Sequence, residues 1–302
     1  MSLAFFINPH SERVGKRGSR IAIHASEFDA KVFDLALFES LPSQVEAALG
    51  SADTFVIEGG DGTVQCVMSE VLRQVGPEGD LPDFAIALGG MTNQVAKIIG
   101  MRRVGKTGLR NITINPPDDI ETRLLKLSAD GMPDQYGFLF STGALPMVTE
   151  YAKNELHTRG IGGSAAVVGG LFKALTSERD SVMPATDCRM EVDGTVMTGS
   201  HLGTVATTLP TVTMGLDPFW GKGDRPLRMT YIDGDYQRLL AHVAGVWVGF
   251  KDKDRSPDGF HSFNADAARF TYDGPVMLDG EPIALPGTEF TLSTSRPVRI
   301  LR

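Results

Sequence analysis

Cysteine is scarce in this sequence, and long hydrophobic runs are missing. Only Cys66 and Cys188 occur among 302 residues, which is too few for a disulfide framework. The longest apolar runs, residues 165–175 and 239–250, contain charged or polar side chains. They fall short of the ~20 apolar residues that a membrane-spanning helix needs. We therefore expect a reduced, cytoplasmic protein without a membrane span, whose contact with a membrane would be peripheral.

Basic residues are in the minority. The chain has 29 Lys and Arg against 37 Asp and Glu, so its formal net charge is −8. Such a balance disfavours nonspecific binding to nucleic acid and broad attraction to anionic membranes, so we expect no nucleic-acid partner. The six histidines lack the His-x-x-x-His spacing of zinc ligands, and we expect no zinc site.

A glycine-rich turn is the most informative motif that the chain does contain. The apolar run Thr54–Ile57 leads into Gly59-Gly60-Asp61-Gly62-Thr63, and apolar residues then recur with helical spacing over 64–75. This order predicts a strand, a turn and a helix. The free N–H groups and the dipole at the start of a helix suit a phosphate, and glycine lets the backbone approach it closely.

Asp61 lies inside this turn and places a carboxylate where a phosphate would bind. We take this to be unfavourable unless Mg²⁺ lies between the two groups or the carboxylate accepts a proton from an attacking hydroxyl. Both cases indicate phosphoryl transfer. We therefore expect Asp61 to organise Mg²⁺ and phosphate, and Thr63 to cap the helix and contact phosphate.

Two more apolar strands end in loops of a related kind. Residues 84–88 precede Gly89–Asn93, and residues 4–7 precede Asn8–Ser11. Ligands of open parallel sheets bind where the carboxyl ends of the strands meet, so we expect the three loops to converge. Basic residues that follow such loops suit a nucleoside triphosphate, although each of them taken singly is as readily an ordinary solvated charge.

The pattern changes after residue 118. Asp-Gly occurs once before residue 120 and six times after it, at 130, 193, 233, 258, 273 and 279. Asp-Gly between alternating apolar residues is a strong hairpin signal. We therefore predict an α/β domain over 1–118, completed by a last strand within 292–302, and a mainly antiparallel β domain over 119–291. A helical insertion over 164–175 interrupts the second domain.

Four motifs in order resemble the diacylglycerol kinase catalytic-domain family, which includes bacterial lipid kinases and sphingosine kinases and is distantly related to NAD kinases. They are Asn8-Pro9-x-Ser11, the block 59–63, the loop 90–94 and Asp279-Gly280-Glu281. The resemblance covers most of the chain and implies an open parallel sheet in the first domain and antiparallel strands in the second. It also implies transfer of the γ-phosphoryl group of ATP, with Mg²⁺, to a lipid hydroxyl.

The resemblance assigns roles to particular residues. It implies that Asp279 is the general base for the lipid hydroxyl, with Glu281 in support, and that Asp61 takes part in catalysis. The sequence pattern alone favours a structural hairpin turn for Asp279, and the resemblance reverses that preference. The residues expected to bind ATP are Asn8, Pro9, Ser11, Arg13, Lys16, Gly59, Gly60, Gly62, Thr63, Gly90, Thr92 and Asn93.

The chain departs from the family pattern at several positions. Glu12 replaces a glycine, and Gln94 replaces an aspartate of the expected metal network. A segment that resembles a structural magnesium site keeps Asp224 but has Arg225 and Arg228 in place of a glycine and an aspartate. Whether these changes abolish a metal site or activity stays open, as does the identity of the lipid.

Three alternatives to a lipid kinase remain. They are a nucleotide-binding protein with weak or no activity, an NAD kinase, and a lipid carrier without chemistry. An NAD kinase would need an Asn-Glu motif after the second glycine loop, where this chain has Asn93-Gln94. A homodimer is compatible with the sequence, which does not specify the oligomeric state.

Overall fold

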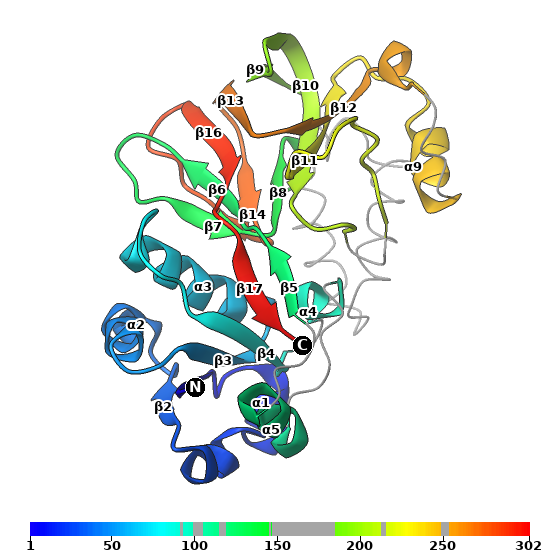
Figure 1. The fold of residues 1–302 in the computed structure, drawn as a ribbon. Coiled ribbons are helices and arrows are strands. Elements are labelled where there is room, and N and C mark those ends of the chain that lie inside the picture. The colour runs from blue at the N-terminus through cyan, green and yellow to red at the C-terminus, as the bar shows by residue number, and fades with distance from the viewer. Residues whose placement is uncertain are drawn as a thin grey trace. The chain divides into compact units, whose positions relative to one another are not determined.

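The computed structural model describes residues 1–90, 93–98, 105–114, 119–144, 146, 185–212, 216–248 and 254–302. The chain divides into two compact units, drawn in Figure 1. Unit 1 consists of Met1–Arg123 and Arg296–Arg302, and unit 2 of Leu124–Ser295. The helical insertion predicted over 164–175 lies outside the described residues.

Unit 1 contains a six-stranded sheet in the order β2-β1-β3-β4-β17-β5. Every neighbouring pair is parallel except β17 and β5. This confirms the open parallel sheet expected for the first domain, apart from the antiparallel strand β5 at its edge. The strands are β1 (Leu3–Ile7), β2 (Lys31–Asp34), β3 (Thr54–Gly59), β4 (Asp83–Leu88), β5 (Asp119–Thr122) and β17 (Val298–Leu301).

Helices cover both faces of this sheet (Figure 1). On one face, Val14 of α1 and Leu109 of α5 pack against Phe5 of β1, while α2 and α3 lie on the opposite face. The periodicity predicted for the helix after the glycine turn is confirmed, because the α3 residues Val64, Val67, Met68, Val71 and Leu72 are all buried. The helical segments are α1 (Glu12–Arg17), η1 (Ala22–Phe28), η2 (Phe38–Ser40), α2 (Leu41–Leu49), α3 (Asp61–Val75), α4 (Gln94–Ile98) and α5 (Lys106–Ile114).

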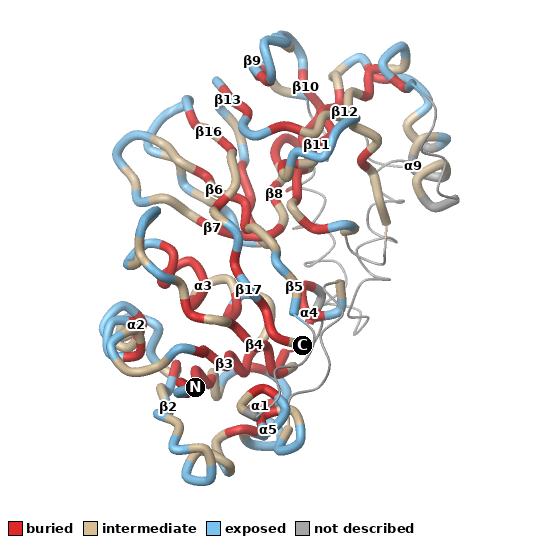
Figure 2. The backbone as a smooth tube through the Cα atoms, in the orientation of Figure 1, coloured by how far each residue is buried: buried red, intermediate tan, exposed pale blue. Residues whose placement is uncertain are grey.

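The central strands of unit 1 form its core, and they are among the stretches that Figure 2 colours as buried. Their apolar runs are covered on both sides, which is typical of strands in a parallel sheet. Phe6 stacks on Phe33 with ring centroids 5.0 Å apart and contacts Phe55 at 5.1 Å. These aromatic contacts hold β1 between β2 and β3, so the carboxyl ends of the strands are fixed relative to one another.

Unit 2 contains an eleven-stranded antiparallel sheet, which confirms the fold expected for the second domain. Its main path runs β15-β14-β8-β10-β9-β13-β16-β6-β7, and β11 pairs with β10 and β12. Its strands are β6 (Leu125–Ser128), β7 (Gln135–Gly137), β8 (Leu139–Thr142), β9 (Thr186–Val192), β10 (Thr195–Thr207), β11 (Leu227–Asp233), β12 (Phe260–Ala265), β13 (Ala267–Tyr272), β14 (Val276–Leu278), β15 (Glu281–Pro282) and β16 (Glu289–Thr294). The segments α9 (Leu239–Val248) and η4 (Ser256–Asp258) follow β11.

Three of the six Asp-Gly pairs lie in hairpin connections. Asp193 and Gly194 join β9 to β10 with φ of 48° and 78°. Asp279 and Gly280 join β14 to β15 with φ of 51° and 85°. Two consecutive left-handed residues are the geometry that hairpins prefer, and Asp-Gly supplies them at low cost. The pair at 130–131 lies in a longer loop between the antiparallel strands β6 and β7.

The other three Asp-Gly pairs do not form hairpin turns. At Asp233-Gly234 the chain leaves β11 toward α9, and the Gly234 N–H donates to the Ser200 carbonyl at 2.7 Å. Gly259 ends the short helix η4 with φ of 81°. Asp273-Gly274 leads from β13 to β14, which pairs with β8 instead of β13. Neither residue of Asp233-Gly234 or of Asp273-Gly274 is left-handed, so the dipeptide alone decides neither the turn conformation nor whether the next strand pairs back.

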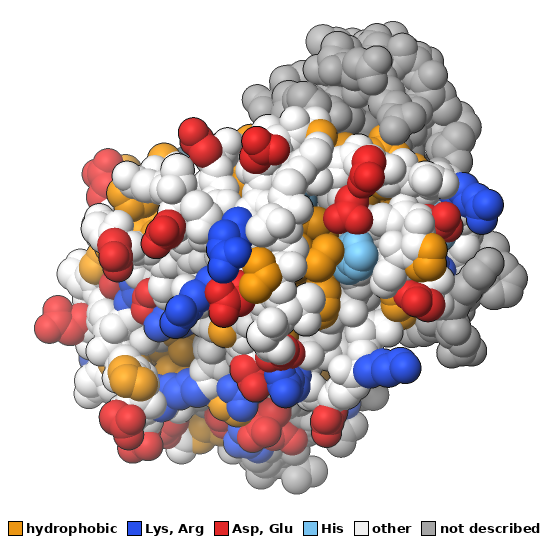
Figure 3. All heavy atoms as spheres, turned by 90° about the horizontal axis from the view of Figure 1, so that it is seen from above, with side chains coloured by type: hydrophobic (Ala, Val, Ile, Leu, Met, Phe, Trp, Pro, Cys, Tyr) orange, Lys and Arg blue, Asp and Glu red, His pale blue; other side chains and the backbone are white. Residues whose placement is uncertain are grey.

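Charged side chains of both signs are interspersed on the face drawn in Figure 3, with hydrophobic groups scattered between them. On that face the described residues form no large patch of one sign. Among the helices of the described residues, none is both long enough and apolar enough to cross a membrane.

Candidate active site

Three loops of unit 1 meet at the carboxyl ends of β1, β3 and β4. The Asn8 side chain donates from Nδ2 to Thr63 Oγ1 at 2.8 Å and so joins the first loop to the start of α3. The Gly89 N–H donates to the Gly59 carbonyl at 3.0 Å, and the Arg13 N–H donates to the Gly89 carbonyl at 2.9 Å. The convergence of the three loops, expected from the sequence, is therefore present.

The glycines at this meeting point are needed for close backbone approach. A Cβ on Gly90 would lie 2.4 Å from Gly60 Cα, and a Cβ on Gly59 would lie 2.4 Å from Thr63 Cβ. Neither contact is tolerable for a side-chain carbon. A Cβ on Gly62 would meet nothing within 4 Å, so the space beside the first turn of α3 is open. The first N–H groups of an α-helix have no acceptor within the helix, which leaves donors available there for an anion.

Asp61 joins the second loop to the third. Its Oδ1 accepts the Val95 N–H in the first turn of α4 at 3.0 Å. A carboxylate at a helix N-terminus is stabilised by the free N–H groups and by the helix dipole. The premise that Asp61 is unfavourable here without an external ligand is therefore wrong, because α4 supplies a protein partner that the sequence did not indicate.

Asn93 shapes the third loop. It is 3% exposed and has a left-handed φ of 46°. Its Nδ2 donates to the Gly90 carbonyl at 2.6 Å, and its Oδ1 accepts the Gly90 N–H at 3.0 Å. Both ends of the amide are thus used to close the loop. Thr92 and the side chain of Gln94 lie outside the described residues.

The first loop leads into α1 and carries polar groups of different kinds. Ser11 precedes α1, and its hydroxyl makes no capping bond to the helix. Lys16 pairs with Glu12 at 2.7 Å, and this hydrogen bond lowers the pKa of the Glu12 carboxyl. Arg13 is exposed and has no ion-pair partner among the described residues. Pro9 is half-buried in the loop itself.

Glu58 was not identified from the sequence. Its carboxylate is 1% exposed and lies at the end of β3, directly before the glycine turn. It accepts the Ser19 hydroxyl at Oε2 and the Arg20 N–H at Oε1, the latter at 2.9 Å. This acid ties the segment after α1 to β3. The available signal was a charged residue inside an otherwise apolar strand.

Asp279 has a defined orientation within unit 2. Its Oδ1 accepts the Phe138 N–H at 2.9 Å and the Leu139 N–H at 2.7 Å. A Cβ on Gly137 would lie 2.7 Å from Asp279 Oδ2, so the carboxylate fits closely against the backbone that leads into β8. Glu281, in β15, is exposed. Asp279 therefore serves both as a turn residue and as an acceptor for two amides.

The segment that contains Asp224 does not fit a magnesium site. Asp224 is exposed, and in the described parts of the chain no group of three His, Cys, Asp or Glu side chains could hold a metal ion. Arg225 pairs instead with Asp193 and Asp266, while Arg228 donates to Asp217 at 2.8 Å. Two guanidinium groups thus occupy a segment in which a cation would need acidic ligands.

Comparisons with known proteins agree with this architecture. Residues 2–122 match the family model described as the diacylglycerol kinase catalytic domain, which confirms the resemblance inferred from the motifs. The chain therefore has a kinase-type fold whose N-terminal part matches that catalytic domain. No curated protein sequence matches the chain.

Solved structures share the fold over nearly the whole chain. A putative diacylglycerol kinase from Bacillus anthracis str. Sterne is 14% identical, with a TM-score of 0.69, covering 99% of this chain and 95% of that one. A second diacylglycerol kinase structure from the same organism is 13% identical, with a TM-score of 0.61 and coverage of 99% and 96%. An NAD kinase from Archaeoglobus fulgidus in complex with ATP is 12% identical, with a TM-score of 0.53 and coverage of 99% and 93%.

Proposed function

We propose that this protein transfers the γ-phosphoryl group of ATP to a hydroxyl of a diacylglycerol-like or sphingoid-like lipid. The observation that supports it most is the convergence of the three loops on the start of α3, where Asn8 contacts Thr63 at 2.8 Å. That arrangement gathers backbone N–H groups and a helix dipole at one point, which suits a chain of phosphates. The match of residues 2–122 to a kinase catalytic domain favours the same reaction class.

The phosphates of ATP are proposed to bind over the open side of Gly62 at the first turn of α3. Ser11 and Arg13 lie at the entrance to α1, which is tied to the third loop through the Arg13 N–H. A hydroxyl donor and a guanidinium at this point would bind phosphate oxygens. Lys16 would have to leave its exposed ion pair with Glu12 to join them, and such a pair is easily broken.

The reaction forms a bond from the lipid oxygen to the γ-phosphorus and breaks the bond to the β–γ bridging oxygen, so ADP leaves. Asp279 is proposed to take the hydroxyl proton, since two amides hold its carboxylate in one orientation. Glu281 is assigned a supporting role. Asp61 is the residue that would hold the Mg²⁺ of MgATP, which would neutralise phosphate charge. The remaining work is positioning and charge neutralisation.

A nucleotide-binding protein without transfer activity is the second candidate. The observations that favour it are the Asp61 contact to the Val95 amide at 3.0 Å and the ion pairs of Arg225 and Arg228, which follow Asp224 in the sequence. Under this alternative ATP binds and stabilises the chain, but no lipid is phosphorylated.

Radiolabelled ATP, offered with Mg²⁺ to a panel of lipid hydroxyls and, separately, to NAD, distinguishes these functions. We expect label in a lipid, and a rise in the thermal midpoint with millimolar MgATP, because a ligand that binds only the folded state stabilises it. Label in NAD alone would identify an NAD kinase. Stabilisation without label would support the second candidate, and no stabilisation at all would contradict both.

Asp279→Asn tests the base. Asparagine also suits a left-handed hairpin position, and its Oδ1 can accept the Phe138 and Leu139 amides in the same place. It cannot accept a proton, so transfer should fall by about 10²–10⁴-fold, while ATP binding is retained. Glu281→Gln, at an exposed position, should cost less. Transfer at the wild-type rate in Asp279→Asn would leave this residue as a turn residue only.

A further inference from the structure

Thr207, at the end of β10, is one peptide group away from the Asp279 carboxylate. The Thr207 side chain is buried, and its hydroxyl donates to the Phe138 carbonyl at 2.6 Å. That carbonyl and the Leu139 N–H belong to the same peptide unit, and the N–H donates to Asp279 Oδ1 at 2.7 Å. A hydroxyl on one side of a peptide group polarises it and strengthens the bond that its N–H makes on the other side.

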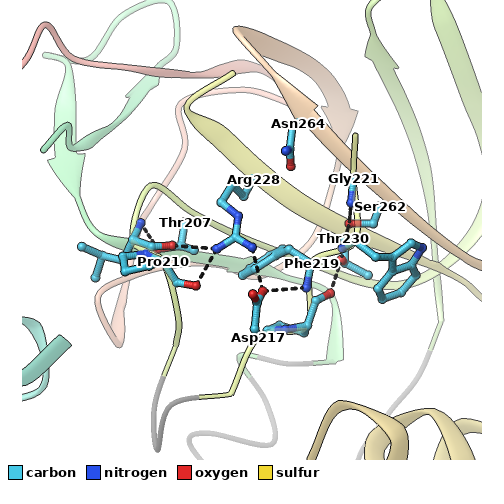
Figure 4. Close-up of polar contacts among 12 residues, drawn as sticks. Thr207, Pro210, Asp217, Phe219, Gly221, Arg228, Thr230, Ser262 and Asn264 are labelled. Carbon is cyan, nitrogen blue, oxygen red and sulfur yellow. Dashed lines mark hydrogen bonds and ion pairs between the residues drawn. The ribbon is translucent and has the colours of Figure 1, made fainter. Parts of the chain in front are cut away.

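Thr207 Oγ1 is also a hydrogen-bond acceptor, on a path that leads toward an arginine. It accepts the Leu209 N–H at 3.1 Å, and the Leu209 carbonyl accepts the Arg228 guanidinium at 3.1 Å. Arg228 also donates to the Pro210 carbonyl at 2.6 Å and to Asp217 Oδ1 at 2.8 Å. Figure 4 shows the guanidinium between the Pro210 carbonyl and the Asp217 carboxylate, with Thr207 beside it.

The Arg228 side chain is well placed to fix the positions of the groups in this chain of hydrogen bonds. Its guanidinium lies 5.0 Å from the centre of the Phe219 ring, and the side chains of Arg228 and Asp217 are only 21% and 11% exposed. A planar guanidinium presents its donors in a rigid fork, so three oxygens bound to it are held at fixed separations. The segment that follows β10 is thereby locked to β11, the strand that carries Arg228.

We propose that Thr207 and Arg228 are positioning residues for Asp279. The inference rests on the proposed function, in which Asp279 accepts the proton of the lipid hydroxyl. Neither side chain is assigned a contact with ATP or lipid. Both act by fixing the peptide group between Phe138 and Leu139, and through it the direction of the carboxylate.

Thr207→Val tests the hydroxyl, because valine keeps the shape of the side chain and loses both hydrogen bonds. Misplacement of a reacting group is costly, so kcat should fall about 10-fold or more, with the KM for ATP unchanged. Thr207→Ser keeps the hydroxyl and is the matched control, expected within about 2-fold of wild type. Wild-type kcat in Thr207→Val, or an equal loss in Thr207→Ser, would overturn the proposal.

Arg228→Met tests the far end of the chain of bonds. We expect a smaller loss of kcat than in Thr207→Val, because Leu209 and Thr207 stay in place between the arginine and the peptide group. Arg225→Met is the control, since Arg225 is 47% exposed and its partners Asp193 and Asp266 lie outside this chain of bonds. Equal rates in the two methionine variants would remove Arg228 from the proposal.

A double-mutant cycle separates positioning from general destabilisation. If Thr207 acts through Asp279, then adding Thr207→Val to Asp279→Asn should cause no further loss of transfer, because the group being positioned can no longer accept a proton. A further loss of about 10-fold, the same as in the wild-type background, would show that Thr207 acts independently of Asp279 and would overturn the inference.

Hydrogen exchange provides a measurement that does not depend on turnover. The Leu139 amide should lose protection in Thr207→Val and keep it in Thr207→Ser, and unchanged protection in both would contradict the inference. Two other results would refute the proposed function, and this inference with it: wild type that transfers no label, or Asp279→Asn that transfers at the wild-type rate. If Asp279→Asn transfers slowly but Thr207→Val transfers at the wild-type rate, only this inference is overturned.

Discussion

Acidification should destabilise unit 2 through His201. This side chain is fully buried on β10, where its Nε2 lies 3.0 Å from Thr204 Oγ1 and 3.4 Å from Thr142 Oγ1. Its ring packs against Tyr231 with centroids 4.7 Å apart, and its Nδ1 is buried with no hydrogen-bond partner among the residues that the structure describes. Burial lowers the pKa of His201 from its ordinary value of 6.5 to about 4.

The sign and size of the effect follow from proton linkage. Between these two pKa values the unfolded chain binds a proton at His201 that the folded chain does not, so the free energy of unfolding falls as the pH falls from 6.5 to about 4. At pH 5 the two pKa values correspond to a factor of about 30 in the folding equilibrium, or about 2 kcal/mol. Below the folded-state pKa the loss levels off at about 3 kcal/mol.

Urea unfolding at about pH 7.5 and about pH 5, followed by tryptophan fluorescence, measures this loss. Both tryptophans of the chain, Trp220 and Trp247, lie in unit 2, so the signal reports on the unit that contains His201. His201→Gln keeps a polar group near the Nε2 position but does not titrate. Wild type should lose about 2 kcal/mol more than this variant between the two pH values.

Carboxylates titrate in both wild type and His201→Gln, so their contribution to the pH dependence of stability cancels when the two proteins are compared. His10→Gln is a matched control, because His10 is exposed on a loop of unit 1 and should leave the fluorescence-detected loss unchanged. The same loss of stability in wild type and His201→Gln would refute the reasoning. A ring that is accessible to water in solution would produce that result.

The remaining predictions concern the loops of unit 1. Asp61→Asn should abolish transfer but keep the contact to α4. Asp61→Ala should also lower the free energy of unfolding by about 1 kcal/mol, because a helix cap is lost. Equal thermal midpoints for these two variants would argue against the cap. Gly90→Ala should cost more than about 1 kcal/mol because its Cβ would lie 2.4 Å from the backbone of the neighbouring loop. Gly62→Ala, with open space around it, should be tolerated, and equal urea midpoints for the two would contradict the close approach. Gln94→Asp should raise the affinity for MgATP in calorimetry, and an unchanged affinity would mean that this chain builds its phosphate site differently.

The sequence was most informative where structure is determined locally. The strand β3 and the helix α3 follow from one apolar run and one helical periodicity, and both are as predicted. The strand ends of a parallel sheet share an edge, so the convergence of the three loops also followed. The hairpins at 193 and 279 were predictable because two left-handed residues in succession favour Asp-Gly.

Contacts between distant segments could not be predicted. Val95 lies 34 residues from Asp61, and Phe138 lies 141 residues from Asp279. No periodicity or turn signal relates such positions, because the backbone N–H groups involved are present at nearly every residue. The sequence marked Arg228 as a departure from a family pattern, but not the carbonyl groups that bind it.

The position of β17 has a consequence for how the protein is made. This strand lies between β4 and β5 in the sheet of unit 1, yet the 172 residues of unit 2, Leu124–Ser295, precede it in the chain. At a synthesis rate of about 5–20 residues per second, the ribosome needs roughly 10–35 s to reach it. Throughout that interval β4, a strand with the apolar sequence Phe84–Leu88, has an unpaired edge, and such edges promote aggregation. A nascent chain of unit 1 should therefore depend on chaperones until β17 emerges. A circular permutant that opens the chain before β17 and joins β17 to the N-terminus, so that β17 is synthesised before β1, should shorten that dependence.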